Sequence, residues 1–551
     1  MRKFILSVSS LAAVGAAVAV PVPRPALAER LASDVDVIGI VHWGLNTYTD
    51  REWGYGDESP AMLAPKAFDA DQIVGACAAG GIRGLVVVAK HHDGFCLGPT
   101  QTTGHNISQA PVRGGKGDYV KEMSDACRKA GLSFGVYCSP WDRNSADYGT
   151  PKYVDTYHAQ IKELLDGRYG EVFEMWFDGA NGGDGYYGGA RTTRKIADGY
   201  YDFDTIFGFV RALQPKVCIF TELRDDADFR WPCNEKGMLD PDSRATIRPF
   251  DGPNYTTYGN VGDVDGTVFH PCEADFPLRP GWFCHEAQNG DVKGGEYLMR
   301  IYLSSVGNGG TMNIGIAPSK DGLLHDGDVQ ALRRFREVKE AFFAKEVREG
   351  PCNFVVMSED ILQGERIVKW SLAVKGQELL AGKSIGRRRM RTLDASVEAG
   401  DVKVTAVDAQ GQPVPVTVRL YAVEPSLVAA VKAAKDPAET VDQHGLGARV
   451  SGDAKTYVCK FEQRMAFDKL RVAPDAEKVG GAPVEFRLFA SDDGAAWRPV
   501  KGAYRLDNVA ANPIPQVVAL EEQVETVYLK LEAVRTLKDE PLTLLGLAVA
   551  R

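Results

Sequence analysis

One aspartate of this chain follows a buried strand at a position where chemistry is common. Residues 171–179 read Glu-Val-Phe-Glu-Met-Trp-Phe-Asp-Gly, a short apolar strand that ends in a carboxylate. An ionised group there costs free energy unless it is solvated, paired or used. Active sites form at the carboxyl ends of strands in alternating strand–helix proteins. Asp178 is therefore a candidate catalytic residue, although an aspartate that caps a turn before the glycine-rich residues 181–185 gives the same pattern.

A second candidate is Glu235, in the aromatic and basic segment 229–237. A partly desolvated carboxyl group there can have a raised pKa, but a loop glutamate paired with Arg230 or Lys236 fits equally well. One ionised aspartate and one protonatable glutamate form the pair that retaining glycoside hydrolysis needs, about 5–5.5 Å apart. The aspartate attacks the anomeric carbon, and the glutamate donates a proton to the leaving oxygen and later removes one from water.

Histidines, aromatic residues and further acids follow other predicted strands. They are His42, Trp43, His91, His92, Tyr137, Trp141, Asp142, Trp176, Glu222 and Trp282. Clefts rich in tryptophan, with scattered histidines and carboxylates, suit sugars, because aromatic faces pack on C–H surfaces while polar groups fix hydroxyls. Each of these residues alone is also compatible with an ordinary core or rim position. The pair His91-His92 lacks the HxH or HExxH spacing of a metal site, so we predict no metal ion.

Short apolar strands alternate with helical segments from residue 37 to residue 344. Strands are expected at 37–41, 84–89, 133–138, 171–178, 216–221 and 311–316, and helices at 69–79, 118–130, 153–165, 203–213, 294–306 and 326–344. This alternation predicts a parallel sheet with helical crossovers. The number of units favours an α/β fold with a (β/α)8-like barrel as the catalytic domain, at residues 29–348.

The pattern changes after about residue 349, where short alternating strands replace the strand–helix units. We expect all-β sandwich modules at residues 349–424 and 436–551, joined by a helical connector at 427–435.

The first 28 residues have the pattern of an export signal. A positive start at residues 1–3 precedes an apolar stretch at 4–20, and Ala26-Leu27-Ala28 fits the small-x-small cleavage pattern. Serines and prolines interrupt this stretch, and no later apolar run is long enough to span a bilayer. We therefore predict a removed signal peptide, a periplasmic or secreted protein and no membrane span.

Charge and cysteine usage exclude two other classes. The 64 basic residues are outnumbered by 74 acidic ones without a basic block, which argues against nucleic acid as a partner. Ten cysteines in a chain of this length do not make a disulfide scaffold. Cys233, Cys272 and Cys284 lie in loops or at strand ends, where pairing remains open.

Taken in order, these motifs resemble the α-L-fucosidases of glycoside hydrolase family 29. The resemblance rests on His42-Trp43-Gly44, Glu52-Trp53 and residues 89–95, 135–141, 176–179, 281–283 and 305–308. It implies a (β/α)8-like barrel, a retaining mechanism, no cofactor, and fucosylated oligosaccharides or glycoproteins as substrates. It assigns the nucleophile to Asp178, and contacts to the fucose hydroxyls or pocket walls to His42, Glu52, Trp53, His91, His92, Tyr137, Trp176 and Trp282.

The segment from Arg230 to Gly237 resembles the RWxGNExG motif of the subgroup that cleaves α-1,3- and α-1,4-linked fucose from branched, Lewis-type glycans. This resemblance assigns the acid/base to Glu235, with Glu222 as the second candidate. Cys233 replaces the first glycine of the motif, and residues 182–201 are an additional stretch. A broader fucosidase for α-1,2 and α-1,6 linkages and a non-catalytic fucose-binding protein therefore stay alternatives. Residues 489–497 resemble discoidin-like sugar-binding domains.

Overall fold

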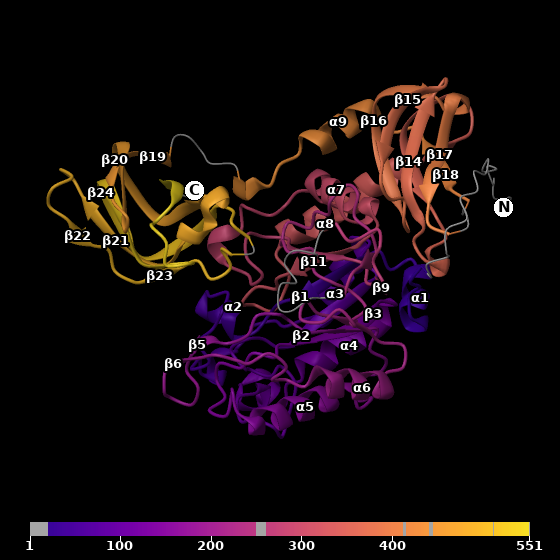
Figure 1. The fold of residues 1–551 in the computed structure, drawn as a ribbon. Helices are drawn as coiled ribbons and strands as arrows, with labels where there is room; N and C mark the ends of the chain where they lie inside the picture. The colour runs from indigo at the N-terminus through magenta and orange to yellow at the C-terminus, as the bar shows by residue number, and fades with distance from the viewer. Residues whose placement is uncertain (1–19, 250–260, 412–414, 440–444, 511, 550–551) are drawn as a thin grey trace. The chain divides into compact units, whose positions relative to one another are not determined.

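The structure is a computed structural model that describes residues 20–249, 261–411, 415–439, 445–510 and 512–549 (Figure 1). The chain forms two compact units. The first consists of residues 1–49, 54–276 and 294–434, and the second of residues 50–53, 277–293 and 435–551. The second unit thus takes two short segments from the sequence of the predicted barrel.

A seven-stranded curled sheet forms the centre of the first unit (Figure 1). Its order is β10 (Glu273–Pro277), β11 (Thr311–Ile316), β1 (Val37–Val41), β2 (Gly84–Lys90), β3 (Ser133–Cys138), β4 (Glu174–Trp176) and β7 (Cys218–Phe220). The pairings from β11 to β7 are all parallel. Phe229 bridges Phe220 and Arg230 bridges Cys272, so residues 229–230 connect the two edges of the sheet. The predicted (β/α)8-like barrel is confirmed.

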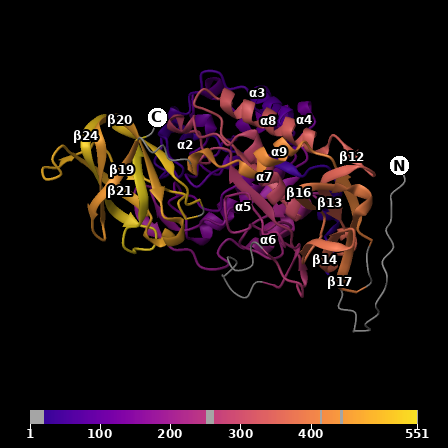
Figure 2. The ribbon, with the colours of Figure 1, turned by 90° about the horizontal axis from the view of Figure 1, so that it is seen from above.

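Helices cover the outside of these strands. They are α3 (Ala70–Ala79), α4 (Tyr119–Ala130), α5 (Pro151–Leu165), α6 (Phe203–Leu213), α7 (Gly295–Ser304) and α8 (Asp326–Phe343). The view from above separates α3, α4 and α8 from α5 and α6 (Figure 2). Because helices pack outside and side chains fill the inside, β1 and β2 are buried at every residue, as their continuous apolar sequences predict.

Local signals explain where these helices begin and end. The Asp69 carboxylate accepts a hydrogen bond from Gln72 N at the start of α3, and Asp118 does the same for Lys121 N at the start of α4, both at 3.0 Å. Gly131 ends α4 in the left-handed conformation, with φ of 71°.

A short helix, α1 (Pro25–Ala32), precedes the barrel and packs onto it. Leu27 is fully buried, and the Arg24 guanidinium donates two hydrogen bonds, at 2.9 and 2.7 Å, to the buried Asp228 carboxylate. The predicted end of the signal peptide, after Ala28, falls inside this helix.

Two antiparallel sheets follow the barrel within the first unit. One has the order β12 (Glu346–Val347), β18 (Thr417–Tyr421), β13 (Pro351–Ser358) and β16 (Arg389–Glu398), and the other β15 (Gln377–Gly382), β14 (Ile367–Val374) and β17 (Val402–Ala409). Their shared core includes the fully buried Trp370. Helix α9 (Pro425–Ala433) comes next in the chain.

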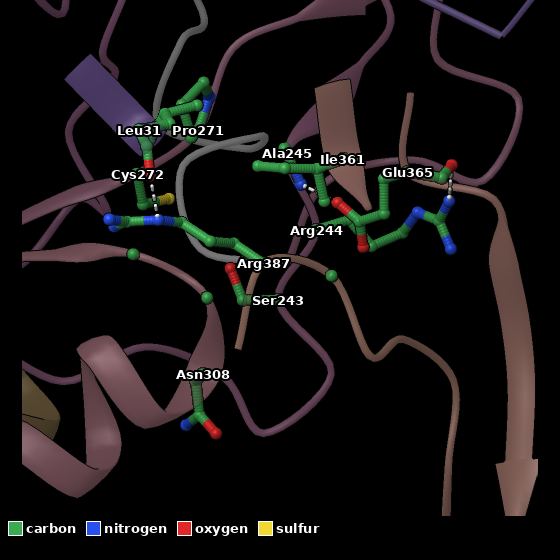
Figure 3. A pocket seen from close by; sticks show the side chains of 13 residues that line it. Leu31, Ser243, Arg244, Ala245, Pro271, Cys272, Asn308, Ile361, Glu365 and Arg387 are labelled. Atoms are coloured by element: carbon green, nitrogen blue, oxygen red, sulfur yellow. Dashed lines mark hydrogen bonds between the residues drawn. The ribbon is translucent and has the colours of Figure 1, made fainter. Parts of the chain in front are cut away.

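Figure 3 shows a pocket at the seam between the barrel and these sheets. Arg387 Nε donates to Leu31 O at 2.9 Å, and Ala245 N donates to Glu365 Oε2 at 2.6 Å. Charged side chains from the segment that forms the two antiparallel sheets thus hydrogen-bond to the main chain of α1 and of a barrel loop.

The second unit has a hydrophobic core of its own, to which the strands of one sheet contribute. The order of this sheet is β19 (Leu446–Gly452), β25 (Leu544–Val549), β20 (Thr456–Pro474), β24 (Gln516–Thr536), β21 (Pro483–Ser491) and β22 (Arg498–Pro499). Strand β23 (Tyr504–Arg505) pairs with β21. The likeness of this unit to discoidin-like domains stays a prediction.

Two further findings concern the described residues as a group. No helix among them is both long enough and apolar enough to cross a membrane. All ten cysteines lie among them, and nine of the ten are buried.

Candidate active site

Asp178 lies two residues beyond β4, at the carboxyl end of the barrel strands. Its Oδ2 accepts a hydrogen bond from Tyr137 Oη at 3.0 Å, and its Oδ1 accepts one from Ala180 N at 2.7 Å. Burial raises the pKa of Asp178 to about 6, although both hydrogen bonds oppose this shift. The side chain stays 23% exposed. The carboxylate therefore caps its own turn through one oxygen and remains reachable, and its catalytic role stays a prediction.

Three histidines line the neighbouring strand ends. His42 follows β1, while His91 and His92 follow β2, and the ring of His91 lies 5.5 Å from that of His42 and 4.1 Å from that of His92. Burial lowers the pKa of His42 to about 3 and holds the pKa of His91 and His92 well below the ordinary value. All three imidazoles are therefore neutral at physiological pH, which suits hydrogen bonding to sugar hydroxyls.

His92 is the histidine that approaches the candidate nucleophile. Its Nε2 lies 3.9 Å from Asp178 Oδ2, and its Nδ1 lies 2.7 Å from Ser139 Oγ. Because the imidazole is neutral, this approach is a polar contact and does not form an ion pair. On the other side, His91 Nδ1 lies 3.3 Å from Asn46 Nδ2.

A stack of aromatic rings continues from Tyr137. Its ring lies 5.3 Å from Trp176, which stacks on Phe220 at 4.1 Å with an interplanar angle of 6°. The indole Nε1 of Trp176 donates to Glu273 Oε1 at 3.1 Å, and Asn313 Nδ2 donates to the same oxygen at 2.9 Å. The barrel interior thus fixes the orientation of Trp176 through a buried acid that the sequence did not single out.

Further carboxyl groups cluster on the other side of Asp178. Glu222 lies two residues beyond β7 and packs against Gly179, where an added Cβ would lie 1.9 Å from Glu222 Oε1. Burial raises the pKa of Glu222 well above its ordinary value, and the negative charges of Asp178 and Glu235 add to the shift. The structure therefore brings Asp178, Glu222 and Glu235 within electrostatic reach of one another.

Asp275, on β10, is a fourth acid of this cluster, and sequence reasoning missed it. Burial raises its pKa well above the ordinary value, with further contributions from Glu235 and Glu222. The spacing of Glu273 and Asp275 is the sequence pattern that could have indicated Asp275, because residues two apart on a strand face the same side of the sheet.

Three of the predicted sugar contacts belong to the second unit: Glu52, Trp53 and Trp282. The Glu52 carboxylate accepts hydrogen bonds from Trp282 N at 2.8 Å and from Phe283 N at 3.2 Å, and it lies 2.6 Å from His285 Nε2. Burial disfavours a charged His285, but hydrogen bonds to Asp50 and Glu52 raise its pKa to about 10. Glu52 therefore organises the segment that carries Trp282, and the roles of these residues toward a sugar stay predictions.

No group of three or more His, Cys, Asp or Glu side chains in the described part of the chain has the arrangement of a metal site.

A curled parallel barrel with acids, neutral histidines and stacked aromatic rings at its strand ends has the architecture of a glycoside hydrolase. The family model described as "Alpha-L-fucosidase" matches residues 28–337, more than half of the chain. The protein belongs to the α-L-fucosidase family.

Relatives support this membership. The chain is 36% identical over 308 residues to alpha-L-fucosidase 1 of Arabidopsis thaliana, covering 55% of this chain and 58% of that protein. It is 37% identical over 331 residues to a relative from Oryza sativa subsp. japonica whose name also places it among the alpha-L-fucosidases, covering 59% of this chain and 60% of that one. The matches thus span about three fifths of these curated relatives.

Among solved structures, the chain is similar to a glycoside hydrolase 29 family member from an unknown rumen bacterium. The sequences are 31% identical, the TM-score is 0.72, and the match covers 96% of this chain and 99% of that one. The fold beyond the barrel therefore also has a counterpart in the family.

Proposed function

We propose that this protein is a retaining exo-α-L-fucosidase that removes α-1,3- and α-1,4-linked fucose from branched, Lewis-type glycans. The observation that carries the proposal is the setting of Asp178. A carboxylate with a pKa of about 6 is held by Tyr137 and Ala180 within electrostatic reach of Glu222 and Glu235, and burial raises the pKa of Glu222. Retaining hydrolysis needs an ionised carboxylate and a second carboxyl group that can carry a proton.

In the proposed reaction, Asp178 Oδ attacks the anomeric carbon of fucose and the bond to the leaving oxygen breaks. Glu235 donates its proton to that oxygen, and a fucosyl ester of Asp178 remains. Glu235 then removes a proton from water, which attacks the same carbon and releases fucose with retained configuration. The neutral histidines and Tyr137 bind sugar hydroxyls, and Trp176 packs on the apolar side of the ring.

We assign the acid/base to Glu235 because Glu222 packs against Gly179 of the segment that carries the nucleophile. A proton donor must reach the leaving oxygen and later a water molecule. Glu235 lies on a loop and is partly exposed, which suits both steps. Its motif also supports the preference for branched glycans, and fucosylated oligosaccharides or glycoproteins are the substrates that we propose.

The test compares hydrolysis of Lewis trisaccharides with that of an aryl α-L-fucoside, and follows the first-formed anomer by NMR. We expect α-L-fucose as the first product and faster turnover of the trisaccharides. Equal or faster turnover of the aryl fucoside, together with cleavage of α-1,2 and α-1,6 linkages, would favour the broader fucosidase. Fucose binding without hydrolysis of any substrate would indicate a binding protein.

We further propose export to the periplasm or the medium, with removal of a signal peptide that ends at Ala28. Such a cut removes Arg24 and Leu27, which contact the barrel in the full chain. N-terminal sequencing of the exported protein tests this proposal: a mature terminus at residue 29 supports it, and a terminus before Arg24 would contradict it.

A further inference from the structure

The loops that follow four consecutive barrel strands converge on one buried residue, Arg143. Its Nη1 donates to Gly54 O at 2.6 Å and its Nε donates to Asp184 O at 2.8 Å. Its backbone N–H donates to His92 O at 2.9 Å. Arg143 follows β3, and the other three residues follow β1, β4 and β2, so one side chain and its main chain join four loops.

The guanidinium group of Arg143 also lies close to two aromatic rings. Its centre is 4.6 Å from the Tyr55 ring and 5.1 Å from the Trp141 ring. Only arginine combines a planar cation that stacks on rings with several N–H donors in fixed directions. The convergence therefore depends on this residue type and not on positive charge alone.

Residue Tyr187 extends this network into the hairpin of β5 (Gly183–Gly185) and β6 (Thr192–Arg194). The backbone N–H of Tyr187 donates to Arg143 O at 2.8 Å. Its hydroxyl accepts a hydrogen bond from Trp141 Nε1 and donates one to Gly183 O, both at 2.9 Å. The hairpin is thus fastened to Trp141 by a buried hydrogen bond.

From Trp141 the contacts lead to the candidate nucleophile. The Trp141 ring lies 5.3 Å from the His92 ring, and the Ser139 hydroxyl that contacts His92 Nδ1 accepts a hydrogen bond from Trp141 N at 3.1 Å. His92 Nε2 in turn lies 3.9 Å from Asp178 Oδ2. The orientation of His92 therefore depends on the placement of Trp141.

We propose that Arg143 and Tyr187 are positioning residues that hold Trp141 against His92, so that the β5–β6 hairpin determines the affinity for the fucose ring itself. Apart from the contacts within the hairpin itself, the partners of Arg143 and Trp141 lie in the loops after β1, β2 and β3, and the loops after β1 and β2 carry the histidines. This inference rests on the proposed function, because it concerns the same site. It adds a role for the 182–201 stretch, and it places that role on the sugar side of the site and not on the side of the leaving group.

The Tyr187→Phe variant tests the proposal, because it keeps the ring and removes only the hydroxyl. One buried hydrogen bond corresponds to between about twofold and tenfold in binding. We expect KM for an aryl α-L-fucoside, KM for a Lewis trisaccharide and Ki for L-fucose to rise by the same factor within that range, while kcat changes little. A Tyr200→Phe variant is the matched control. Its hydroxyl bonds to Gly149 N and Thr150 O, away from Trp141, and it should keep wild-type constants.

Two results would overturn the proposal. One is an unchanged Ki for L-fucose in Tyr187→Phe, and the other is a loss that affects the trisaccharide alone. A double-mutant cycle with Trp141→Phe separates positioning from general destabilisation. If Tyr187 acts through Trp141, the double variant should lose no more affinity than the single variant that has the larger loss. Calorimetric titration of L-fucose, performed well below the melting temperature, gives the same comparison without turnover. If the wild type binds L-fucose but hydrolyses nothing, the proposed function fails while the positioning roles can still be decided.

Discussion

The two sides of the site around Asp178 experience the same burial with opposite consequences. On the side of β1 and β2, burial lowers the pKa of His42, His91 and His92 and keeps the imidazoles neutral. On the side of β7 and β10, burial raises the pKa of Glu222 and Asp275 well above the ordinary value and so favours their protonated forms. Desolvation disfavours whichever form is charged.

This difference indicates a division of labour. The neutral histidine side offers hydrogen bonds whose strength does not depend on pH near neutrality, which suits recognition of sugar hydroxyls. The acid side favours protonated carboxyl groups, and a protonated carboxyl group is what proton donation to a leaving oxygen needs. Asp178, with a pKa of about 6, lies where the two sides meet.

Removing the nucleophile should have the largest effect. In Asp178→Ala we expect kcat to fall by at least about a thousandfold, because no group is left to form the covalent intermediate. Azide should restore turnover and give β-fucosyl azide. Near-wild-type turnover without azide would remove Asp178 from this role.

The dependence of turnover on the leaving group of the substrate tests the acid side. In Glu235→Ala, turnover of a Lewis trisaccharide should fall by roughly a hundredfold or more, while an aryl fucoside with a good leaving group should lose far less, because it needs little proton donation. Glu222→Gln is the matched comparison. If Glu222→Gln shows this selectivity and Glu235→Ala does not, the acid/base is Glu222.

The pH dependence of kcat/KM tests the hydrogen bond between Tyr137 and Asp178, where the two sides meet. A nucleophile must be ionised, so kcat/KM should rise as pH increases through about 6. The Tyr137 hydroxyl stabilises the ionised form of Asp178, so Tyr137→Phe should raise that pKa and move the acidic limb upward by roughly one unit. Tyr157→Phe, whose hydroxyl bonds to Cys138 O instead, should leave the limb in place. An unshifted limb in Tyr137→Phe would contradict this link.

The smallest expected effect is on stability. Because the pKa of Asp178 is higher in the folded state, its contribution to stability is present at low pH and is lost as pH rises through about 6. Asp178→Asn should therefore be more stable than the wild type at pH 8, by on the order of 1–3 kcal/mol, and this gain should disappear near pH 4. Melting temperatures at the two pH values measure it, and an equal gain at both would show that charge is not the cause.

The sequence predicted the barrel well because its strands are short, apolar and buried on both faces. Strands β1, β3 and β11 and helix α6 have the expected bounds. Strand β4 is shorter than expected, at Glu174–Trp176, because Asp178 already belongs to the turn. Strand β10 was missed because its sequence, Glu-Ala-Asp-Phe-Pro, carries two acids that are buried inside the barrel.

For the site, the motifs selected Asp178 and the histidines as candidates, but they did not predict the contacts that hold these side chains. The link from Arg143 through Tyr187 and Trp141 joins residues far apart in sequence by hydrogen bonds that no local pattern encodes. Likewise, the proximity of Glu222 to Gly179 follows from the pairing of β4 with β7. Strand ends indicate where chemistry takes place, and the fold decides which side chains meet there.

Trapping of the covalent intermediate tests the central claim most directly. Incubation with a 2-deoxy-2-fluoro-fucosyl fluoride should slow the second step and leave a fucosyl ester, which mass spectrometry of the digested protein can locate. We predict one label, on the peptide that contains Asp178, and none in Asp178→Ala. A label on Glu222, Glu235 or Asp275, or full inactivation without any label, would contradict the account.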